Sequence, residues 1–255
     1  MAAEVPLLRS SVLLDGFVHG FSTRVGGISE GPYAWLNLGA KWGDDPARVR
    51  ENRRRFFRAA GIDGVLSLSQ VHGAEVTVID AALATDPEAV ARTRADALVT
   101  ELPGIAIAVY TADCVPVLLA DPVRGALAAV HAGWRGMVAG VIGAAVATLG
   151  RAFGSRPADL RAALGPSIGP CCFEVGDEVA VQFSPAFVKP GAPSRGRPVV
   201  DLRAAARDSL LTAGVPAGQI DADPPCTACD ASRFYSFRRD GRETGQHVAF
   251  MARRA

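Results

Sequence analysis

The feature that most constrains the fold is a series of short apolar and β-branched runs separated by Gly, Pro and Asp. Runs of this length that end at turn-forming residues predict strands rather than helices. The predicted strands cover residues 17–22, 75–80, 96–100, 105–110, 115–120 and 126–131. The chain therefore builds most of its core from closely spaced β-strands.

Helices are predicted between these strands and after them. Asp44 or Asp45 can cap a first helix, Pro46 suits its first turn, and Gly61 ends it. A second helix over residues 136–149 is apolar on a wide face and is expected to lie buried against the sheet. Two more are expected over residues 175–183 and 202–213, and the Pro- and Gly-rich stretch 184–198 is expected to be a loop. Neighbouring strands with separated helices favour an α+β fold over strict βαβ alternation.

Length and composition indicate one globular domain over residues 1–255, with 49% hydrophobic and 21% charged residues. The net charge of +1 gives no reason to expect nucleic acid or an anionic membrane as a partner, and no protein partner is evident. The N-terminal residues lack a basic stretch leading into an apolar core, and no apolar run approaches the ~18 residues of a membrane helix. We therefore expect a cytoplasmic protein.

Three residues with metal-binding side chains, His72, Cys114 and His131, stand at the ends of apolar runs. Two neutral imidazoles and one thiolate suit Zn²⁺, and three protein ligands leave a fourth position open, as in catalytic zinc sites. Separations of 42 and 17 residues match no short zinc motif. The alternative is that each residue is an ordinary core or turn residue.

The other four cysteines form an adjacent pair, Cys171-Cys172, and a C-x-x-C motif, Cys226 to Cys229. A structural zinc site normally joins the C-x-x-C motif to a second motif of similar spacing. The adjacent pair does not have that spacing, so these four are expected to be core or loop thiols. An odd cysteine total also argues against a secreted disulfide framework.

The segment 165–169 satisfies the G-x-S-x-G pattern of a serine hydrolase, and Asp201 or Asp221 with His247 would complete the triad order. However, that motif needs a helix beginning at the serine, and here Gly169-Pro170 follows Ser167 almost at once. A tight turn is the better interpretation. The Gly-rich segment 22–29 offers amides, hydroxyls and Arg24 for an anion, with an ordinary hairpin turn as the alternative.

Several of these segments together resemble a known family. They are Gly20-Phe21-Ser22-Thr23-Arg24-Val25-Gly26-Gly27-Ile28-Ser29, Leu36-Asn37-Leu38-Gly39, Gln70-Val71-His72-Gly73, Thr111-Ala112-Asp113-Cys114-Val115-Pro116-Val117, His131-Ala132-Gly133-Trp134-Arg135-Gly136 and Gly165-Pro166-Ser167-Ile168-Gly169. In this order they are similar to the multicopper-polyphenol-oxidase-like "laccase domain" family, also called YfiH-like purine nucleoside phosphorylases. The resemblance runs from about residue 16 to the C-terminus.

The resemblance implies a layered α/β/β/α sandwich of cysteine-hydrolase-like architecture. It implies zinc held by His72, Cys114 and His131, with copper possible in some preparations. The implied activity is phosphorolysis of adenosine, inosine, guanosine and methylthioadenosine, with adenosine deamination as a companion, so the partners are a small nucleoside and phosphate. Cys114, His131 and Arg24 are implied as catalytic, and the implied substrate contacts are Arg24, Asn37, Gln70, Asp113 and Arg135.

Two positions depart from the family pattern. Phe237 stands where many relatives have Tyr or His, and Gln246 stands where many have Arg. Both changes affect the expected substrate choice and leave the metal ligands untouched. Other activities stay open: a Cys114/His131 or zinc-dependent amide hydrolase that edits peptidoglycan precursors, or a copper-dependent phenol oxidase. The oxidase is disfavoured because a multicopper site needs more than the four His present.

Overall fold

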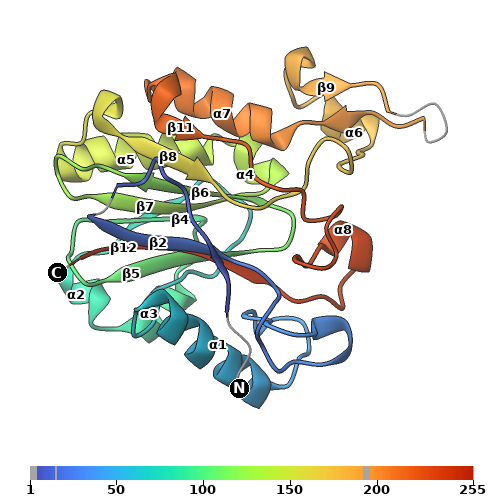
Figure 1. Ribbon diagram of the computed structural model, residues 1–255. Coiled ribbons are helices and arrows are strands. Elements are labelled where there is room, and N and C mark those ends of the chain that lie inside the picture. The colour runs from blue at the N-terminus through green and yellow to red at the C-terminus, as the bar shows by residue number, and fades with distance from the viewer. Residues whose placement is uncertain (1–4, 15, 192–195, 255) are drawn as a thin grey trace.

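The computed structural model describes residues 5–14, 16–191 and 196–254, which form two facing β-sheets with helices on both outer sides (Figure 1). The larger sheet has six strands in the order β11-β8-β6-β7-β4-β3 and is antiparallel except at its two edges, where β11 pairs with β8 and β3 with β4 in parallel. Its strands are β3 (Val76–Val78), β4 (Ala97–Thr100), β6 (Val115–Ala120), β7 (Leu127–Ala132), β8 (Arg161–Leu164) and β11 (Ile220–Asp221).

The smaller sheet is antiparallel and brings the C-terminal strand between two earlier ones, in the order β1-β2-β12-β5. A separate two-stranded ribbon pairs β9 with β10. The strands of the sheet are β1 (Leu7–Leu8), β2 (Phe17–Ser22), β5 (Ala106–Thr111) and β12 (His247–Arg253), and those of the ribbon are β9 (Val188–Lys189) and β10 (Val199–Val200).

Helices α4 (Trp134–Val138), α5 (Val141–Phe153) and α7 (Leu202–Thr212) lie along the outer side of the six-stranded sheet, and α1 (Pro46–Ala60) lies along the other sheet (Figure 1). The shorter α-helices are α2 (Ala81–Ala84), α3 (Pro87–Arg92), α6 (Asp177–Ala180) and α8 (Phe237–Asp240). Single 3₁₀ turns occur at η1 (Gly31–Tyr33), η2 (Pro157–Asp159), η3 (Pro185–Phe187) and η4 (Ala217–Gln219).

The layering explains why the central strands are apolar at every position instead of alternating. In β6, Val117 and Leu119 belong to the core beneath α5 and α7, while Leu118 and Ala120 belong to the core between the two sheets. A strand buried on both faces needs apolar residues on both. A third core lies under α1, where Phe56 meets Phe250 edge to face. The predicted α+β, α/β/β/α layered fold is confirmed.

The predicted strands are confirmed within one or two residues at their ends. Helix α1 also begins and ends as predicted, because the Asp45 side chain accepts the Ala47 amide and Gly61 ends the helix at φ 71°. The single helix predicted over 136–149 is wrong: α4 and α5 are separate because Gly140 has φ 83° and interrupts the helical conformation. Over 175–183 only the single turn α6 is helical.

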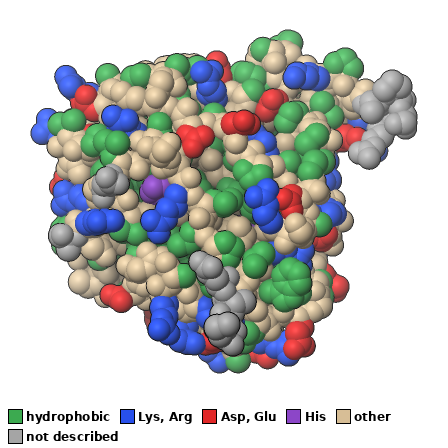
Figure 2. Space-filling view, viewed as in Figure 1, with side chains coloured by type: hydrophobic (Ala, Val, Ile, Leu, Met, Phe, Trp, Pro, Cys, Tyr) green, Lys and Arg blue, Asp and Glu red, His purple; other side chains and the backbone are tan. Residues whose placement is uncertain are grey.

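No helix among the described residues is long and apolar enough to cross a membrane. On the face shown in Figure 2, Lys and Arg side chains lie interspersed with Asp and Glu over the surface, as the small net charge suggests.

Candidate metal centre and the cavities around it

Antiparallel pairing of β6 with β7 brings two of the predicted ligands to one edge of the six-stranded sheet. The register sets Val115 opposite Ala132 and Pro116 opposite His131. Cys114, the residue before β6, therefore lies beside His131, near the end of β7. Asp113 precedes it with φ 90°, a left-handed conformation that is uncommon for a residue other than Gly and is typical of functional sites.

A single carboxylate positions both histidine ligands. Asp96 accepts the backbone amides of Val71, His72 and Gly73 at 3.2, 2.9 and 2.7 Å, which holds His72 in a left-handed turn with φ 61°. The same carboxylate lies 2.8 Å from Nδ1 of His131. A proton on Nδ1 leaves Nε2 free to bind a metal, so Asp96 orients both histidines.

The ligand atoms of His72, Cys114 and His131 all lie within 4.8 Å of one another. His72 Nε2 is 3.9 Å from Cys114 Sγ, and the two imidazole rings meet edge to face at 4.8 Å between centroids. Gly133 permits this approach, because a Cβ there would lie 2.7 Å from His72 Cδ2. Two imidazoles and a thiolate at this spacing fit one zinc ion with an open fourth position.

Electrostatics favour the charged forms of the buried groups. Burial opposes a thiolate, yet His131 and His72 lower the pKa of Cys114 to about 6. Burial likewise opposes an imidazolium, and Cys114 with Asp96 raises the pKa of His131 to about 9. The pKa of Asp96 is lowered despite its burial, because His131 and the amides of Gly73 and His72 stabilise the carboxylate. The thiolate is therefore available to a cation at neutral pH.

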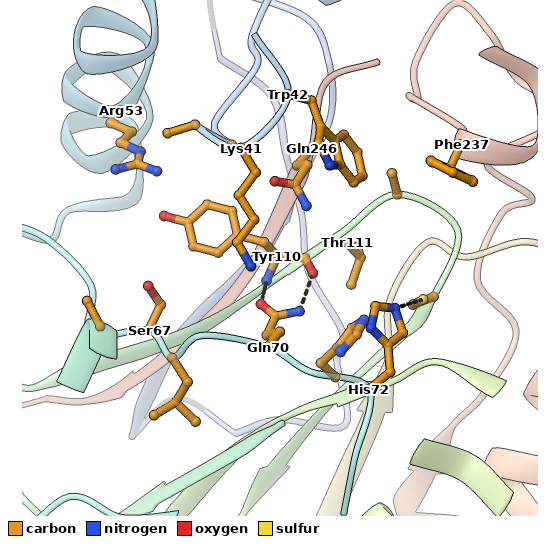
Figure 3. A pocket seen from close by; sticks show the side chains of 17 residues that line it. Lys41, Trp42, Arg53, Ser67, Gln70, His72, Tyr110, Thr111, Phe237 and Gln246 are labelled. Atoms are coloured by element: carbon orange, nitrogen blue, oxygen red, sulfur yellow. Dashed lines mark hydrogen bonds between the residues drawn. The ribbon is translucent and has the colours of Figure 1, made fainter. Parts of the chain in front are cut away.

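The centre lies where two cavities meet. A first cavity of about 570 Å³ and a second of about 650 Å³ share His72, Ala112, Cys114 and Phe237 in their linings. Both volumes are in the range of small-molecule sites. Figure 3 shows Lys41, Trp42 and Gln246 facing His72 across the first cavity. The second cavity is lined by Arg135, Arg197 and Arg238, together with Glu174 and Glu178.

Three of the five predicted substrate contacts line these cavities. Gln70 lines the first, but its side chain donates to the Tyr110 carbonyl at 2.8 Å and accepts the Tyr110 amide at 2.7 Å (Figure 3). It acts as a brace between the His72 turn and β5. Asp113 and Arg135 line the second cavity. Arg135 is exposed, and its guanidinium lies 4.3 Å from the Trp134 ring centroid. A guanidinium stacked in this way can still donate hydrogen bonds from its edge.

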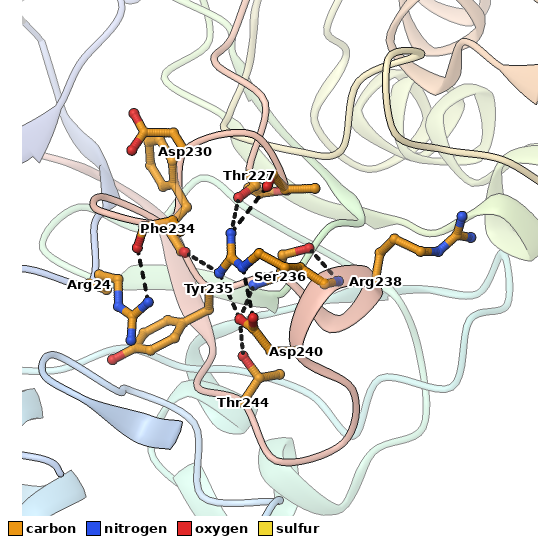
Figure 4. Close-up of polar contacts among 12 residues, drawn as sticks. Arg24, Thr227, Asp230, Phe234, Tyr235, Ser236, Arg238, Asp240 and Thr244 are labelled. Atoms are coloured by element: carbon orange, nitrogen blue, oxygen red, sulfur yellow. Dashed lines mark hydrogen bonds and ion pairs between the residues drawn. The ribbon is translucent and has the colours of Figure 1, made fainter. Parts of the chain in front are cut away.

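Arg24 lies outside both linings. Its Nε donates to the Ala34 carbonyl at 2.8 Å and its Nη1 to the Ala231 carbonyl at 3.0 Å, and the guanidinium stacks 4.6 Å over Tyr235 (Figure 4). These contacts favour the turn-forming alternative for the segment 22–29, because the guanidinium edges that would meet an anion bind backbone oxygens.

Asn37 also lies outside both linings and is buried. Its amide donates to the Gly39 carbonyl and to Asp44, and its oxygen accepts the Gly39 and Gln246 amides. The side chain therefore shapes the loop that carries Lys41 and Trp42.

Sequence reasoning missed most of the lining and the orienting carboxylate. Asp96 was assigned only to the start of a strand. Phe237 and Gln246, the two departures from the family pattern, also line the first cavity. The missed lining residues include Lys41, Trp42, Arg53, Tyr110, Arg197 and Arg238.

A polar network holds the wall beside Cys114. Asp113 accepts the Thr227 hydroxyl at 2.6 Å, the Ser236 hydroxyl at 3.0 Å and the Arg238 amide at 2.6 Å. Burial raises the pKa of Asp113, although these donors oppose that shift. Figure 4 shows Thr227, Ser236 and Arg238 gathered on this wall.

The serine-hydrolase arrangement is absent from the described residues. Ser167 is fully buried, its hydroxyl accepts from Arg203 at 3.2 Å, and no helix begins at it. Asp201 instead caps α7, and Nε2 of His247 accepts the Tyr235 amide.

Comparison with known proteins agrees with this architecture. Residues 18–254 match the family model described as multi-copper polyphenol oxidoreductase laccase. The chain is 38% identical to the purine nucleoside phosphorylase YlmD of Geobacillus stearothermophilus, over 94% of this chain and 91% of that one. It is 41% identical to the purine nucleoside phosphorylase YfiH of Escherichia coli, over 90% and 91%.

A further relative, 40% identical over 90% of this chain and 91% of its own, is the adenosine deaminase RL5 from an unknown prokaryotic organism. The crystal structure of YlmD from Geobacillus stearothermophilus superimposes with a TM-score of 0.89 at 35% identity, covering 98% of this chain and 96% of that one. The chain thus belongs to the multi-copper polyphenol oxidoreductase laccase family, whose members include YlmD and YfiH.

Proposed function

We propose that this chain is a zinc-dependent purine nucleoside phosphorylase acting on adenosine, inosine, guanosine and methylthioadenosine, with adenosine deamination as a companion activity. The observation that carries the proposal is the placement of His72, Cys114 and His131 where two cavities meet. One cavity can hold a nucleoside while the other holds phosphate. The names of the relatives, phosphorylases and one deaminase, support this choice of reaction.

The linings suggest how the two substrates divide the space. The first cavity has the rings of Trp42, Tyr110 and Phe237, with aromatic faces on which a purine can stack. The second has Arg135 and Arg197, whose guanidinium groups suit phosphate, while Nη1 of Arg238 already donates to the Cys172 and Glu174 carbonyls. We therefore place the base in the first cavity, phosphate in the second, and the ribose between them.

In phosphorolysis, a phosphate oxygen bonds to the ribose anomeric carbon, and the carbon–nitrogen bond to the purine breaks with its electron pair leaving on the base. Zinc, when bound, supplies Lewis acidity at the open coordination position. The chain contributes orientation: Asp96 holds the proton on His131 Nδ1, and the arginines bring phosphate to the reacting carbon.

A second candidate is a thiol or zinc-dependent amide hydrolase acting on peptidoglycan precursors. The lowered pKa of Cys114 favours it, because a thiolate beside an imidazolium is also the arrangement of a cysteine nucleophile. A copper phenol oxidase is less favoured. Only His72 and His131 of the four histidines stand at the centre, while Nε2 of His19 and of His247 accept backbone amides.

The test combines elemental analysis of the purified protein with a product screen on adenosine, with and without phosphate. We expect the zinc content to fall by about one ion per chain in His72→Ala, and ribose 1-phosphate to form only when phosphate is present. Metal-free protein with full activity would favour the thiol hydrolase. The five free cysteines suit a reducing compartment, so we place the reaction in the cytoplasm.

A further inference from the structure

Four cysteine side chains from two distant segments converge at the surface, apart from the centre described above. The sulfur atoms of Cys171, Cys172, Cys226 and Cys229 all lie within 4.8 Å of one another. Cys229 Sγ is 3.4 Å from both Cys171 Sγ and Cys172 Sγ, although 58 and 57 positions separate them in sequence. The four cysteines lie outside the helices and strands, as expected of loop thiols, but the fold brings all four together.

Backbone pairing brings the two segments together. Ser167 forms a parallel bridge with Cys226, in which the Thr227 amide donates to the Ser167 carbonyl at 3.1 Å. The Ser167 amide donates to the Pro225 carbonyl at 3.4 Å. The turn after the bridge then folds back, with the Cys172 amide donating to the Gly169 carbonyl at 3.0 Å. The adjacent pair takes the place of a second C-x-x-C motif because this turn aims both thiols at Cys229.

The sulfur spacing fits one tetrahedral ion. Zinc bonded to four thiolates at about 2.3 Å places the sulfur atoms about 3.8 Å apart. A disulfide requires about 2.05 Å, which the 3.4 Å separations exceed. An iron–sulfur cluster with a different iron behind each thiolate needs wider spacing. Exposed Cys171 and Cys229 give an ion access from solvent.

Backbone donors around Cys226 prepare it for a cation. The Gly169 amide donates to Cys226 Sγ at 3.2 Å. An amide that donates to a sulfur stabilises the thiolate, which is the form that binds a metal.

Three arginines donate hydrogen bonds to the two segments that carry the cysteines. Arg239 Nη1 donates to the carbonyls of Thr227 and Ala228, inside the C-x-x-C motif, at 3.0 and 3.3 Å. Arg238 Nη1 donates to the Cys172 carbonyl at 3.3 Å, and Arg203 donates to Ser167. Four thiolates and one Zn²⁺ carry a net charge of −2, so guanidinium groups on both segments favour the metal-bound form.

We propose that Cys171, Cys172, Cys226 and Cys229 bind one structural Zn²⁺, with the thiol protons released to solvent. The ion ties the segment after β8 to the segment after β11. The second segment carries Thr227, whose hydroxyl bonds Asp113 beside Cys114, so the zinc also steadies the wall of the second cavity. This inference does not depend on the proposed reaction or on the metal held by His72.

The test counts metal in protein purified with a reductant. His72→Ala removes a ligand from the first centre, so the zinc that this variant retains reports the cysteine cluster. We expect about one zinc per chain in His72→Ala, and none in His72→Ala combined with Cys229→Ser. His72→Ala combined with Cys229→His keeps four ligands of a Cys₃His set and should retain the ion.

Two measurements on the unmutated chain guard against variants that fail to fold. Co²⁺ added to the metal-depleted protein should give the strong thiolate-to-metal absorption of a tetrathiolate site, which a centre with one thiolate lacks. The four thiols should resist alkylation until a chelator is added, and the chelator should lower Tm. Metal-free His72→Ala with freely alkylated cysteines, a disulfide within the cluster, or iron in place of zinc would each overturn the proposal.

Discussion

Oδ1 of Asp96 lies 2.8 Å from Nδ1 of His131, and the same carboxylate accepts the backbone amide of His72. Asp96 is fully buried at the start of β4, opposite the end of β7. It sets the tautomer of one ligand and the backbone position of another, although it lies outside the ligand set itself.

Asp96→Asn should weaken metal binding at this centre about 10- to 100-fold, the usual cost of losing a carboxylate behind a ligating histidine. The neutral amide oxygen stabilises the proton on His131 Nδ1 less than a carboxylate does, and the NH₂ group replaces the oxygen that accepts the Val71 and Gly73 amides. Competition with a chromophoric chelator would measure the change. An unaltered zinc affinity would show that Asp96 only supports the turn.

His72→Ala should abolish zinc binding at this centre, because two remaining ligands hold the ion poorly. Activity should fall together with zinc binding, by more than about 100-fold. That loss exceeds the usual effect of mutating a residue that only hydrogen-bonds to a metal ligand. Turnover should be measured on protein whose metal content is known. His72 is neither nucleophile nor base in a thiol hydrolase, so a variant that has lost the zinc of this centre and keeps near-normal turnover contradicts the metal mechanism.

Cys114→Ser separates a ligand from a nucleophile, since the change is nearly isosteric. As a ligand, serine should bind zinc weakly, and added Zn²⁺ should restore part of the activity. We expect this partial rescue, measured as rate against free zinc. A nucleophile would show no rescue, and the unmutated chain would form a covalent adduct at Cys114 with a reactive substrate analogue.

Arg135→Lys should raise the KM for phosphate about tenfold, or about 1.4 kcal/mol, with a smaller effect on the nucleoside KM. Lysine keeps the charge and loses the planar pair of donors that phosphate prefers. Arg24→Lys is the matched control, because its guanidinium binds the carbonyls of Ala34 and Ala231. That variant should lose about 1–2 kcal/mol of stability and leave the ratio of the two KM values unchanged. A raised phosphate KM in Arg24→Lys, with no change in Arg135→Lys, would instead indicate that Arg24 contacts phosphate.

His247 makes stability depend on pH. Burial lowers its pKa to about 3, and the charges of Arg24 and Arg239 add to the shift. Between pH 6.5 and about 3 the unfolded chain binds a proton that the folded chain excludes, so the free energy of unfolding falls as pH falls. His247→Gln is neutral throughout and should lose less stability on acidification, by about 1.4 kcal/mol per pH unit. Urea unfolding at several pH values measures this difference. If His247 contributes nothing, the free energy of unfolding will fall with pH at the same rate in His247→Gln and in the unmutated chain.

Local patterning was enough to predict most of the elements. Residues 115–120 and 126–131 have the length and apolar content of buried strands. The local conformational preferences of Asp45, Pro46 and Gly61 favour the start and the end of α1. The break at Gly140 escaped the prediction because a glycine inside an apolar periodic run does not reveal its φ. The residue types also identified His72, Cys114 and His131 as candidate zinc ligands, since few side chains bind zinc.

The tertiary structure decided what those side chains meet. Spacing could not show that Asp96 lies beside His131, because strand pairing across 35 positions creates that contact. Long-range backbone pairing likewise brings Cys171 and Cys172 into contact with Cys229. Hydrogen bonds to backbone carbonyls hold the Arg24 guanidinium outside the cavities. Sequence determined the elements through short-range conformational preference, whereas the sites depend on long-range pairing, in which the partners are chosen by the packing of the whole chain.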